Sequence, residues 1–392
     1  MNKYVLFYCV LVSLNIFSQS SQGTESRATS FPQGFGIGLL SSYGSSSIYN
    51  DVSNLSFMNP ATITQFKNYS LGLSYQFNTN IKDGYFVDID VSRVHNIIPQ
   101  SFGAVINFED FSLGISFGQC YNMSVDIEPV PVTTMENPYG TGELFSPTME
   151  TVIQDFGITS AYSFENVFSK DNLNVGLKFS LGRFYDYTKL YRNEFNAEDY
   201  SPALSAGIFY KYSLDENRSI DLGLMYQSKI EFNGKVETNF PSKVFDPDPS
   251  GDSSIYVIDV VPSISSHLPD QINSDLSIDV TKKLKLLTSL NFILWQGQPT
   301  RWENQLIYST SAVFSFSETV NASFGFYSSA MELKEEENFS SVFDDFDVFF
   351  ITAGLKLSLN NINIDIALAD SHLLSGKFRE QTIGKIALGL TL

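Results

Sequence analysis

The sequence is poor in the residues that most catalytic and metal sites need. Its 392 residues include two cysteines and three histidines. The histidines, His95, His267 and His372, are far apart, and no spacing of Cys and His fits a zinc site. Cys9 lies in an apolar N-terminal leader, so the rest of the chain keeps one thiol, Cys120, which cannot form an internal disulfide. We therefore predict no metal site and no cofactor.

Positive charge is scarce as well. The chain has 24 Lys and Arg against 43 Asp and Glu, and its net charge of −19 argues against nucleic acid as a partner. The apolar run 4–17 is too short for the roughly 20 residues of a spanning helix. A Lys precedes it and small residues follow it, which is the layout of a secretory signal peptide. We expect residues 1–20 to be that signal, cleaved after Ser18 or Ser20.

What the sequence has in abundance is strict alternation of apolar and polar residues. Clear examples are "YSLGLSYQF" (69–77), "FSLGISFG" (111–118), "LNVGLKFSLG" (173–182), "SIDLGLMYQ" (219–227) and "IGKIALGLTL" (383–392). Successive side chains on a strand face opposite ways, so each stretch has one apolar face and one face of Gly, Ser, Asn and charge. A soluble β-sandwich alternates too, but long strands with such a polar face favour a membrane barrel. No later segment suits a spanning helix, and in lipid only a closed barrel then satisfies the backbone.

The connections between these stretches alternate between short and long. The predicted tight turns are at 107–110, 214–217, 281–283, 317–319 and 359–361. The predicted long outer loops are near 127–150, 188–199, 233–267, 299–304, 333–345 and 373–380. We predict an all-β fold, a transmembrane antiparallel β-barrel of about 14 strands. Residues 84–94 also alternate, but a single-chain bacterial barrel has an even number of strands, so we assign them to the first outer loop.

The residues before the first strand do not alternate, and they end in Asn59-Pro60-Ala61. With Gly38 and Gly44, this segment resembles the start of the FadL/TodX family of outer-membrane transporters for long-chain fatty acids and aromatic hydrocarbons. That family begins with a Gly-rich segment, a run of small residues and an Asn-Pro-Ala motif just before the first strand. The match predicts that these five residues belong to a hatch motif.

Two further stretches carry the same resemblance. Residues 202–236 contain a strand, a short turn, a strand with Gly and Tyr, and a Gly-Lys step into a long loop. Residues 268–296 have Leu-Pro entering a strand, a tight turn, and Trp295 ending the return strand. The chain departs from the family at 273–274, where Gly is common, and at Leu392, which replaces the usual terminal aromatic residue.

The resemblance implies a fourteen-stranded barrel (65–392) whose lumen is plugged by an N-terminal hatch (21–64). A barrel of this size has a wide lumen, so a permeability barrier needs a plug. In the family, the ligand moves to a lumen site near the hatch and leaves sideways through a gap in the wall. We expect a monomeric channel in the outer membrane of a Gram-negative bacterium, surrounded by lipid and lipopolysaccharide. Its predicted function is passive uptake of hydrophobic molecules, with ligand-lining residues unknown.

Other functions compete with this prediction. Barrels of the PorV type share the architecture and a similar N-terminal motif, and they act as partners in a protein secretion system. A purely structural porin is a third reading, although it would not need a long segment before its first strand. Asp246, Asp248 and Asp252 form an oxygen-rich stretch, but two prolines break the spacing of a calcium loop, so a solvated loop is predicted.

An enzyme is not predicted. The stretch "GISFG" (114–118) fits the nucleophile-elbow pattern, which needs a sharp turn between a strand and a helix. Ser116 instead lies within strict alternation, in the middle of a predicted strand. We therefore assign no catalytic residue.

Overall fold

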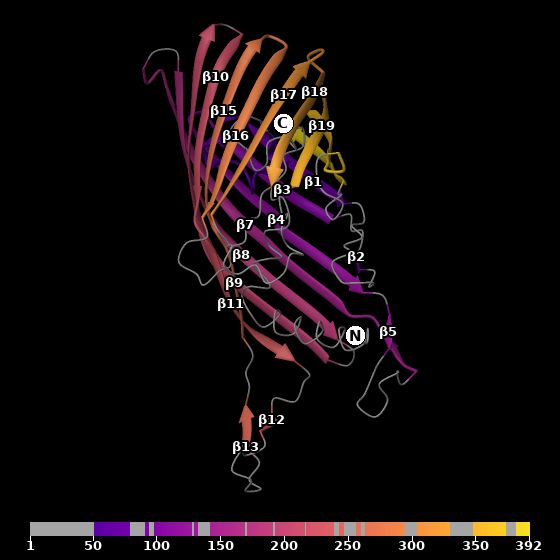
Figure 1. Ribbon diagram of the computed structural model, residues 1–392. Coiled ribbons are helices and arrows are strands. Elements are labelled where there is room, and N and C mark those ends of the chain that lie inside the picture. The colour runs from indigo at the N-terminus through magenta and orange to yellow at the C-terminus, as the bar shows by residue number, and fades with distance from the viewer. Residues whose placement is uncertain are drawn as a thin grey trace.

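The described chain is a closed antiparallel β-barrel (Figure 1). The structure is a computed structural model. It describes residues 51–78, 91–93, 98–127, 129–131, 142–168, 171–190, 193–215, 217–238, 243–246, 256–259, 263–294, 304–329, 348–373 and 382–392. No helix among these residues is long and apolar enough to cross a membrane.

Among the described residues, fourteen strand positions form the wall, and β21 pairs with β1 to close it. The predicted fourteen-stranded barrel is therefore confirmed. In wall order the strands are β1 (Tyr69–Asn78), β3 (Ile98–Phe108), β4 (Phe111–Ile127), β7 (Thr148–Glu165), β8 (Asp171–Leu190), β9 (Asn193–Asp215), β10 (Arg218–Gln227), β15 (Asp270–Thr281), β16 (Leu284–Leu294), β17 (Gln305–Ser315), β18 (Val320–Ser329), β19 (Val348–Leu359), β20 (Ile362–Asp370) and β21 (Thr382–Thr391).

Shorter strands lie beyond this wall. β11 (Ile230–Thr238) follows β10 and pairs with β14 (Ser263–Leu268), which precedes β15. The remaining short strands are β2 (Val91–Arg93), β5 (Val130–Pro131), β6 (Leu144–Phe145), β12 (Lys243–Asp246) and β13 (Tyr256–Asp259). β1 pairs directly with β3, and within the described residues β2 pairs with the far end of β4. Of residues 84–94, which we assigned to the first outer loop, the structure describes 91–93, and these form β2, which is not one of the fourteen wall strands.

The barrel has a turn end, with the predicted tight turns, and an opposite loop end. The prediction of a loop over 188–199 is wrong, because β8 and β9 stay paired up to Leu190 and Asn193. β8 and β9 are 20 and 23 residues long, whereas about 9 to 11 residues cross a bilayer. Their paired backbones satisfy each other past the bilayer, so the polar side chains there belong to strands. We call these outer parts the extension: residues 148–154, 183–190, 193–200, 230–238 and 263–268.

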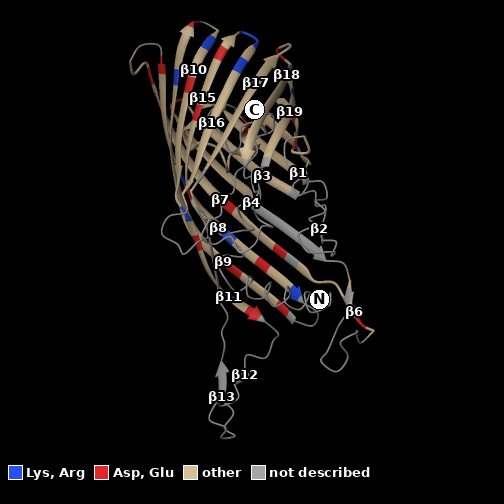
Figure 2. Ribbon diagram, in the orientation of Figure 1, with Lys and Arg blue, Asp and Glu red and all other residues tan. Residues whose placement is uncertain are grey.

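The middle of the wall, here called the band, turns apolar side chains outward. On β8, Leu177 is 52% exposed and its neighbour Lys178 only 4%. β10 repeats the pattern, with Leu222 exposed and Asp221 buried. Charged residues gather toward the two ends of the strands, and few lie between (Figure 2). The predicted assignment of inward and outward faces is confirmed, and it is the pattern of a barrel in lipid.

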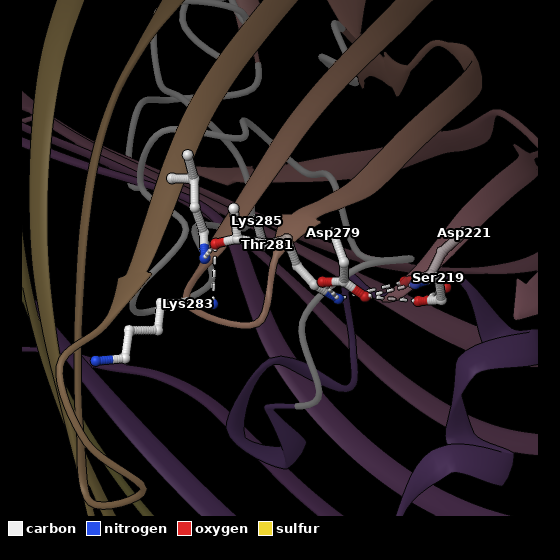
Figure 3. A network of polar contacts seen from close by, with 7 residues as sticks. Ser219, Asp221, Asp279, Thr281, Lys283 and Lys285 are labelled. Atoms are coloured by element: carbon white, nitrogen blue, oxygen red, sulfur yellow. Dashed lines mark hydrogen bonds and ion pairs between the residues drawn. The ribbon is translucent and has the colours of Figure 1, made fainter. Parts of the chain in front are cut away.

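A polar network fastens the turn end across β10, β15 and β16 (Figure 3). The backbone N and the Oγ of Ser219 donate to Asp279 Oδ2 at 3.0 and 2.8 Å. Lys285 Nζ lies 3.4 Å from Asp221 and 3.3 Å from Asp279. The network thus joins three neighbouring strands near their turns.

Candidate functional site

Residues 51–66, here called the inner segment, lie against the lumen side of the wall. The segment contains the 3-10 helices η1 (Val52–Asn54) and η2 (Pro60–Gln65). Its apolar side chains pack with two wall residues in one buried cluster: Val52, Leu55, Met58, Ile63, Phe66, Val105 and Ala161. Among the described glycines, five make room for it, because a Cβ there would clash with the segment: Gly72, Gly103, Gly118, Gly176 and Gly207.

The predicted motif Asn59-Pro60-Ala61 sits over two of these glycines. Gly176 of β8 and Gly207 of β9 are direct partners across the ladder. A Cβ on Gly176 would clash with Pro60, and one on Gly207 would clash with the Asn59 side chain. Pro60 is the first residue of η2, where its missing N–H costs nothing. The motif therefore forms a compact turn that packs directly on the backbone of the wall, where the two paired glycines have no side chains.

Asn59 joins this turn to the wall by hydrogen bonds. Its Nδ2 donates to the carbonyl oxygens of Ile208 on β9 (3.0 Å) and Leu224 on β10 (3.1 Å). Its Oδ1 accepts from the backbone N of Ala61 at 3.0 Å, which caps η2. One buried amide thus fixes both the turn and its place on two strands.

The inner segment has further polar ties on other strands. The Asn107 Nδ2 of β3 donates to the carbonyl oxygens of Thr64 (3.1 Å) and Phe66 (2.7 Å). Ser101, also on β3, donates its hydroxyl to the Ser53 carbonyl. These bonds hold both ends of the segment to the same strand.

An ion pair holds the middle of the segment. Lys178 of β8 and Asp155 of β7 are paired inside the barrel, with side chains 5% and 4% exposed. Lys178 Nζ donates to the Ser56 carbonyl at 2.6 Å, and Ser56 Oγ donates to Asp155 Oδ2 at 2.8 Å. Both charges therefore have hydrogen-bond partners, which a buried pair requires.

The wall has a break between β3 and β4. Their ladder ends at the pair Ser101–Gly118. The register between β4 and β7 then shifts at Cys120, which is the extra residue of a β-bulge. Gln100 Nε2 donates to the Gln119 carbonyl at 3.0 Å. Gln100 and Gln119 are the residues next to the last ladder pair, so among the described residues of β3 and β4 this side-chain bond replaces the next backbone bond of the ladder. We call this place the wall break.

An apolar cluster lies on the inner face beside the wall break. Phe184 and Phe232 stack in it, with ring centroids 5.4 Å apart. Phe57 of the inner segment packs against it. Its members, here called the inner apolar cluster, are Cys120, Ile153, Phe184, Ala197, Ala203, Ile230, Phe232 and Leu268. At the level of the extension the inner side of the wall therefore holds a closely packed, buried apolar cluster.

Sequence reasoning missed this cluster, although β8 carries a signal for it. Apolar residues point outward along the band as far as Leu181. Two residues later the polarity reverses, so that Arg183 lies on the outer face and Phe184 is fully buried on the inner face. The same reversal appears on β11, where Ile230 and Phe232 are buried. Strands that leave the bilayer meet water outside, so charged residues such as Arg183 can lie on the outer face while Phe184, Ile230 and Phe232 turn inward.

The outer face of the extension is correspondingly polar. Arg183 Nε donates to Glu198 at 2.7 Å, and the Tyr200 hydroxyl donates to the same oxygen at 2.8 Å. These two bonds, first that of Tyr200 and then that of Arg183, lower the pKa of the Glu198 carboxyl. Arg183 also lies over the ring of Tyr185, 5.8 Å from its centroid. This face suits water or lipid headgroups rather than hydrocarbon.

The other candidate residues have no site in common. Ser116 lies in the middle of β4, paired with Gly157, and not at a strand-to-helix turn. His267 belongs to β14, and His372 follows β20. Within the described ranges, no group of three His, Cys, Asp or Glu residues could hold a metal ion. Several residues singled out in the sequence lie outside those ranges: Gly38, Gly44, His95, Asp248, Asp252 and Trp295.

No family model and no curated protein sequence matches the chain. Solved structures do match it. The toluene transporter TbuX of Ralstonia pickettii is 13% identical, with 92% of this chain and 99% of that chain covered and a TM-score of 0.61. The toluene transporter TodX of P. putida is 12% identical, with coverage of 92% and 99% and a TM-score of 0.58. A Pseudomonas aeruginosa FadL homologue is 12% identical, with coverage of 92% and 98% and a TM-score of 0.54. The fourteen-stranded barrel that the sequence resemblance implied is confirmed.

Proposed function

We propose that this chain, which has the fold of the FadL/TodX channels, is an outer-membrane channel for passive uptake of hydrophobic molecules. Its substrates are long-chain fatty acids or aromatic hydrocarbons. The inner apolar cluster beside the wall break carries the proposal. A water-filled porin has a polar lumen, whereas an apolar inner surface binds apolar ligands. The channel works as a monomer, without a cofactor and without catalysis.

The proposed route runs from the loop end to the wall break. A hydrophobic molecule binds at the inner apolar cluster and leaves sideways into the bilayer between β3 and β4. The bond between Gln100 and the Gln119 carbonyl must open for this step. One such hydrogen bond contributes only about 0.5–1.5 kcal/mol net, far less than a whole ladder. The break is therefore the weakest seam between these two strands.

The proposed barrier to other solutes is a hatch over residues 21–64, of which residues 51–64 are described and belong to the inner segment. Its fit over Gly176 and Gly207 and its ties through Asn59 support this assignment. We further propose a cleaved signal peptide over 1–20, a barrel domain over 65–392, and a loop end that faces outward. There the polar face of the extension would contact lipopolysaccharide.

The secretion-partner alternative gains no support from the described residues. The similar structures are described as toluene transporters, a monoaromatic hydrocarbon channel and a FadL homologue. An apolar cluster buried inside the lumen also serves a small hydrophobic ligand better than a protein partner.

Deleting residues 24–56 tests the proposal. The wall strands pair without these residues, so we expect a folded barrel with heat-modifiable mobility on gels. Small polar solutes should leak through vesicles that contain it, and saturable uptake of a fatty acid or an aromatic hydrocarbon should fall. A secretion partner would instead lose surface display of its cargo and keep hydrophobic uptake. Unchanged leakage together with unchanged uptake would refute the plugged-channel proposal.

A further inference from the structure

The ion pair of Lys178 and Asp155 lies directly beside the wall break. Asp155 is the ladder partner of Gly118, and Gly118 is also the last β4 residue paired with β3. The pair is therefore located where the backbone ladder between β3 and β4 ends. It is also buried, so water does not screen it.

Glycines on two strands give this pair its space. A Cβ on Gly157 would clash with the Lys178 side chain, which crosses β7 to reach Asp155. A Cβ on Gly118 would lie 2.5 Å from Ser56 Cβ and 2.7 Å from the Phe57 ring. β4, β7 and β8 thus form one binding site for Ser56, which packs on Gly118 and forms hydrogen bonds with Asp155 and Lys178.

This binding site fixes a side chain of the inner apolar cluster. Phe57 directly follows Ser56 and packs against the cluster that contains Cys120. Lys178 donates to both the carbonyl and the hydroxyl of Ser56, at 2.6 and 3.3 Å. Because the backbone of Ser56 is held, Phe57 cannot leave the cluster without loss of these bonds.

We propose that Lys178 and Asp155 are positioning residues that hold Ser56 and Phe57 over the wall break, so that the inner segment closes it from inside. The inference rests on the proposed function, in which this break is the exit. The pair contributes to closing because each charge would lose a partner if the segment moved. Movement of Phe57 would uncover Cys120 and open the inner apolar cluster toward β3.

The reactivity of Cys120 with a water-soluble maleimide reports this movement without any substrate. The full-length barrel is labelled in detergent, and the modified peptide is quantified by mass spectrometry, so that Cys9 does not contribute. We expect Lys178→Met and Asp155→Asn each to raise the labelling rate at Cys120 about tenfold or more, because one buried charge is left without its partner. Ser56→Ala should raise the rate by a smaller factor.

Lys189→Met is the matched control. Lys189 lies on the same strand and pairs with Glu194 at 2.9 Å, but both side chains are exposed. Its loss should leave the labelling rate of Cys120 unchanged. The double variant Asp155→Leu/Lys178→Met replaces both charges with apolar groups, so the barrel should unfold at the temperature of the unmodified protein. Cys120 should nevertheless react fast, which separates a positioning role from general stability.

Folded variants that label Cys120 at the original rate would overturn the inference, as would equal acceleration by Lys189→Met. If the wall variants fail to fold, Ser56→Ala decides, because it leaves every wall residue intact, and an unchanged rate with it refutes the inference. Absence of hydrophobic uptake by the unmodified protein, together with fast labelling of the variants, would refute the proposed function and leave the positioning role standing.

Discussion

The band and the extension are built from the same continuous strands, yet their polarity is opposite. On β8 the band turns Leu177 outward and Lys178 inward, whereas the extension turns Arg183 outward and buries Phe184. The medium outside explains the difference, because hydrocarbon accepts apolar side chains and water accepts polar ones. Which face of a strand is apolar is therefore decided by depth in the membrane and not by the strand itself.

The reversal also divides the lumen. Inside the band the wall is mostly polar, and the inner segment meets it through hydrogen bonds of Ser56 and Asn59 and by packing on Val105 and Ala161. Inside the extension the inner apolar cluster lies beside buried polar side chains such as Thr151 and Asp186, and Phe57 packs against the cluster. The wall break lies at the boundary between these regions. A hydrophobic molecule that enters the apolar part thus reaches a seam beside lipid before it reaches the polar part.

The largest expected effect comes from emptying the apolar interior of the extension. Phe184→Ala removes a fully buried ring, which costs about 3–5 kcal/mol at such positions. The matched variant is Phe179→Ala on the same strand, where the ring is 60% exposed and points to lipid. Denaturant unfolding in detergent measures both. Equal losses would mean that Phe184 on the inner face of the extension is no better packed than an outward-facing ring of the band.

A charge on the outer face should distinguish the two regions next. Leu177→Arg places a cation in the band and should cost about 2–4 kcal/mol of folding free energy in lipid. Tyr187→Arg places the same cation on the outer side of the extension and should cost little. Refolding equilibria in lipid vesicles give both values. A similar cost at both positions would contradict the assigned boundary of the band.

The smallest expected effect is a pH dependence of local stability, confined to the extension around Glu198. The pKa of Glu198 is lowered by Tyr200 and Arg183, so its carboxylate adds stability above its ordinary pKa of 4.5. That stability is lost as the pH falls through the lower folded pKa, and exposure to water limits it to about 1 kcal/mol. The hydrogen-exchange protection factors of residues 193–200, which are corrected for the intrinsic rate at each pH, should therefore fall only in acid. Glu198→Gln should remove the change, and a variant that keeps it would refute the assignment.

The strands, the tight turns and the two faces of the wall could be predicted because each depends on neighbouring residues. Alternation around Leu177 or Leu222 defines a strand and its outward side without knowledge of any partner. The extension was mistaken for a loop at 188–199 because its outward residues are polar, and polar residues between apolar strands read as a connection. The correct signal is that side chains still alternate between apolar and polar, while the apolar residues move from the outward positions to the inward positions of the strand.

The wall break and the ion pair could not be predicted in this way. Ser56 meets Asp155 across 99 residues of sequence and Lys178 across 122, so local patterns hold no trace of these contacts. The break depends on where two ladders lose register at Cys120, which only the closed barrel determines. The motif Asn59-Pro60-Ala61 could be found by resemblance, but its seat on Gly176 and Gly207 required the fold.

Uptake of a labelled aromatic hydrocarbon or long-chain fatty acid tests the central claim most directly. The assay compares Gram-negative cells that lack a channel of this kind with the same cells producing this protein in their outer membrane. We predict saturable uptake of the hydrophobic molecule in the producing cells, while a polar solute of similar size enters at the background rate. Hydrophobic uptake no faster than in the cells without the protein would contradict the account.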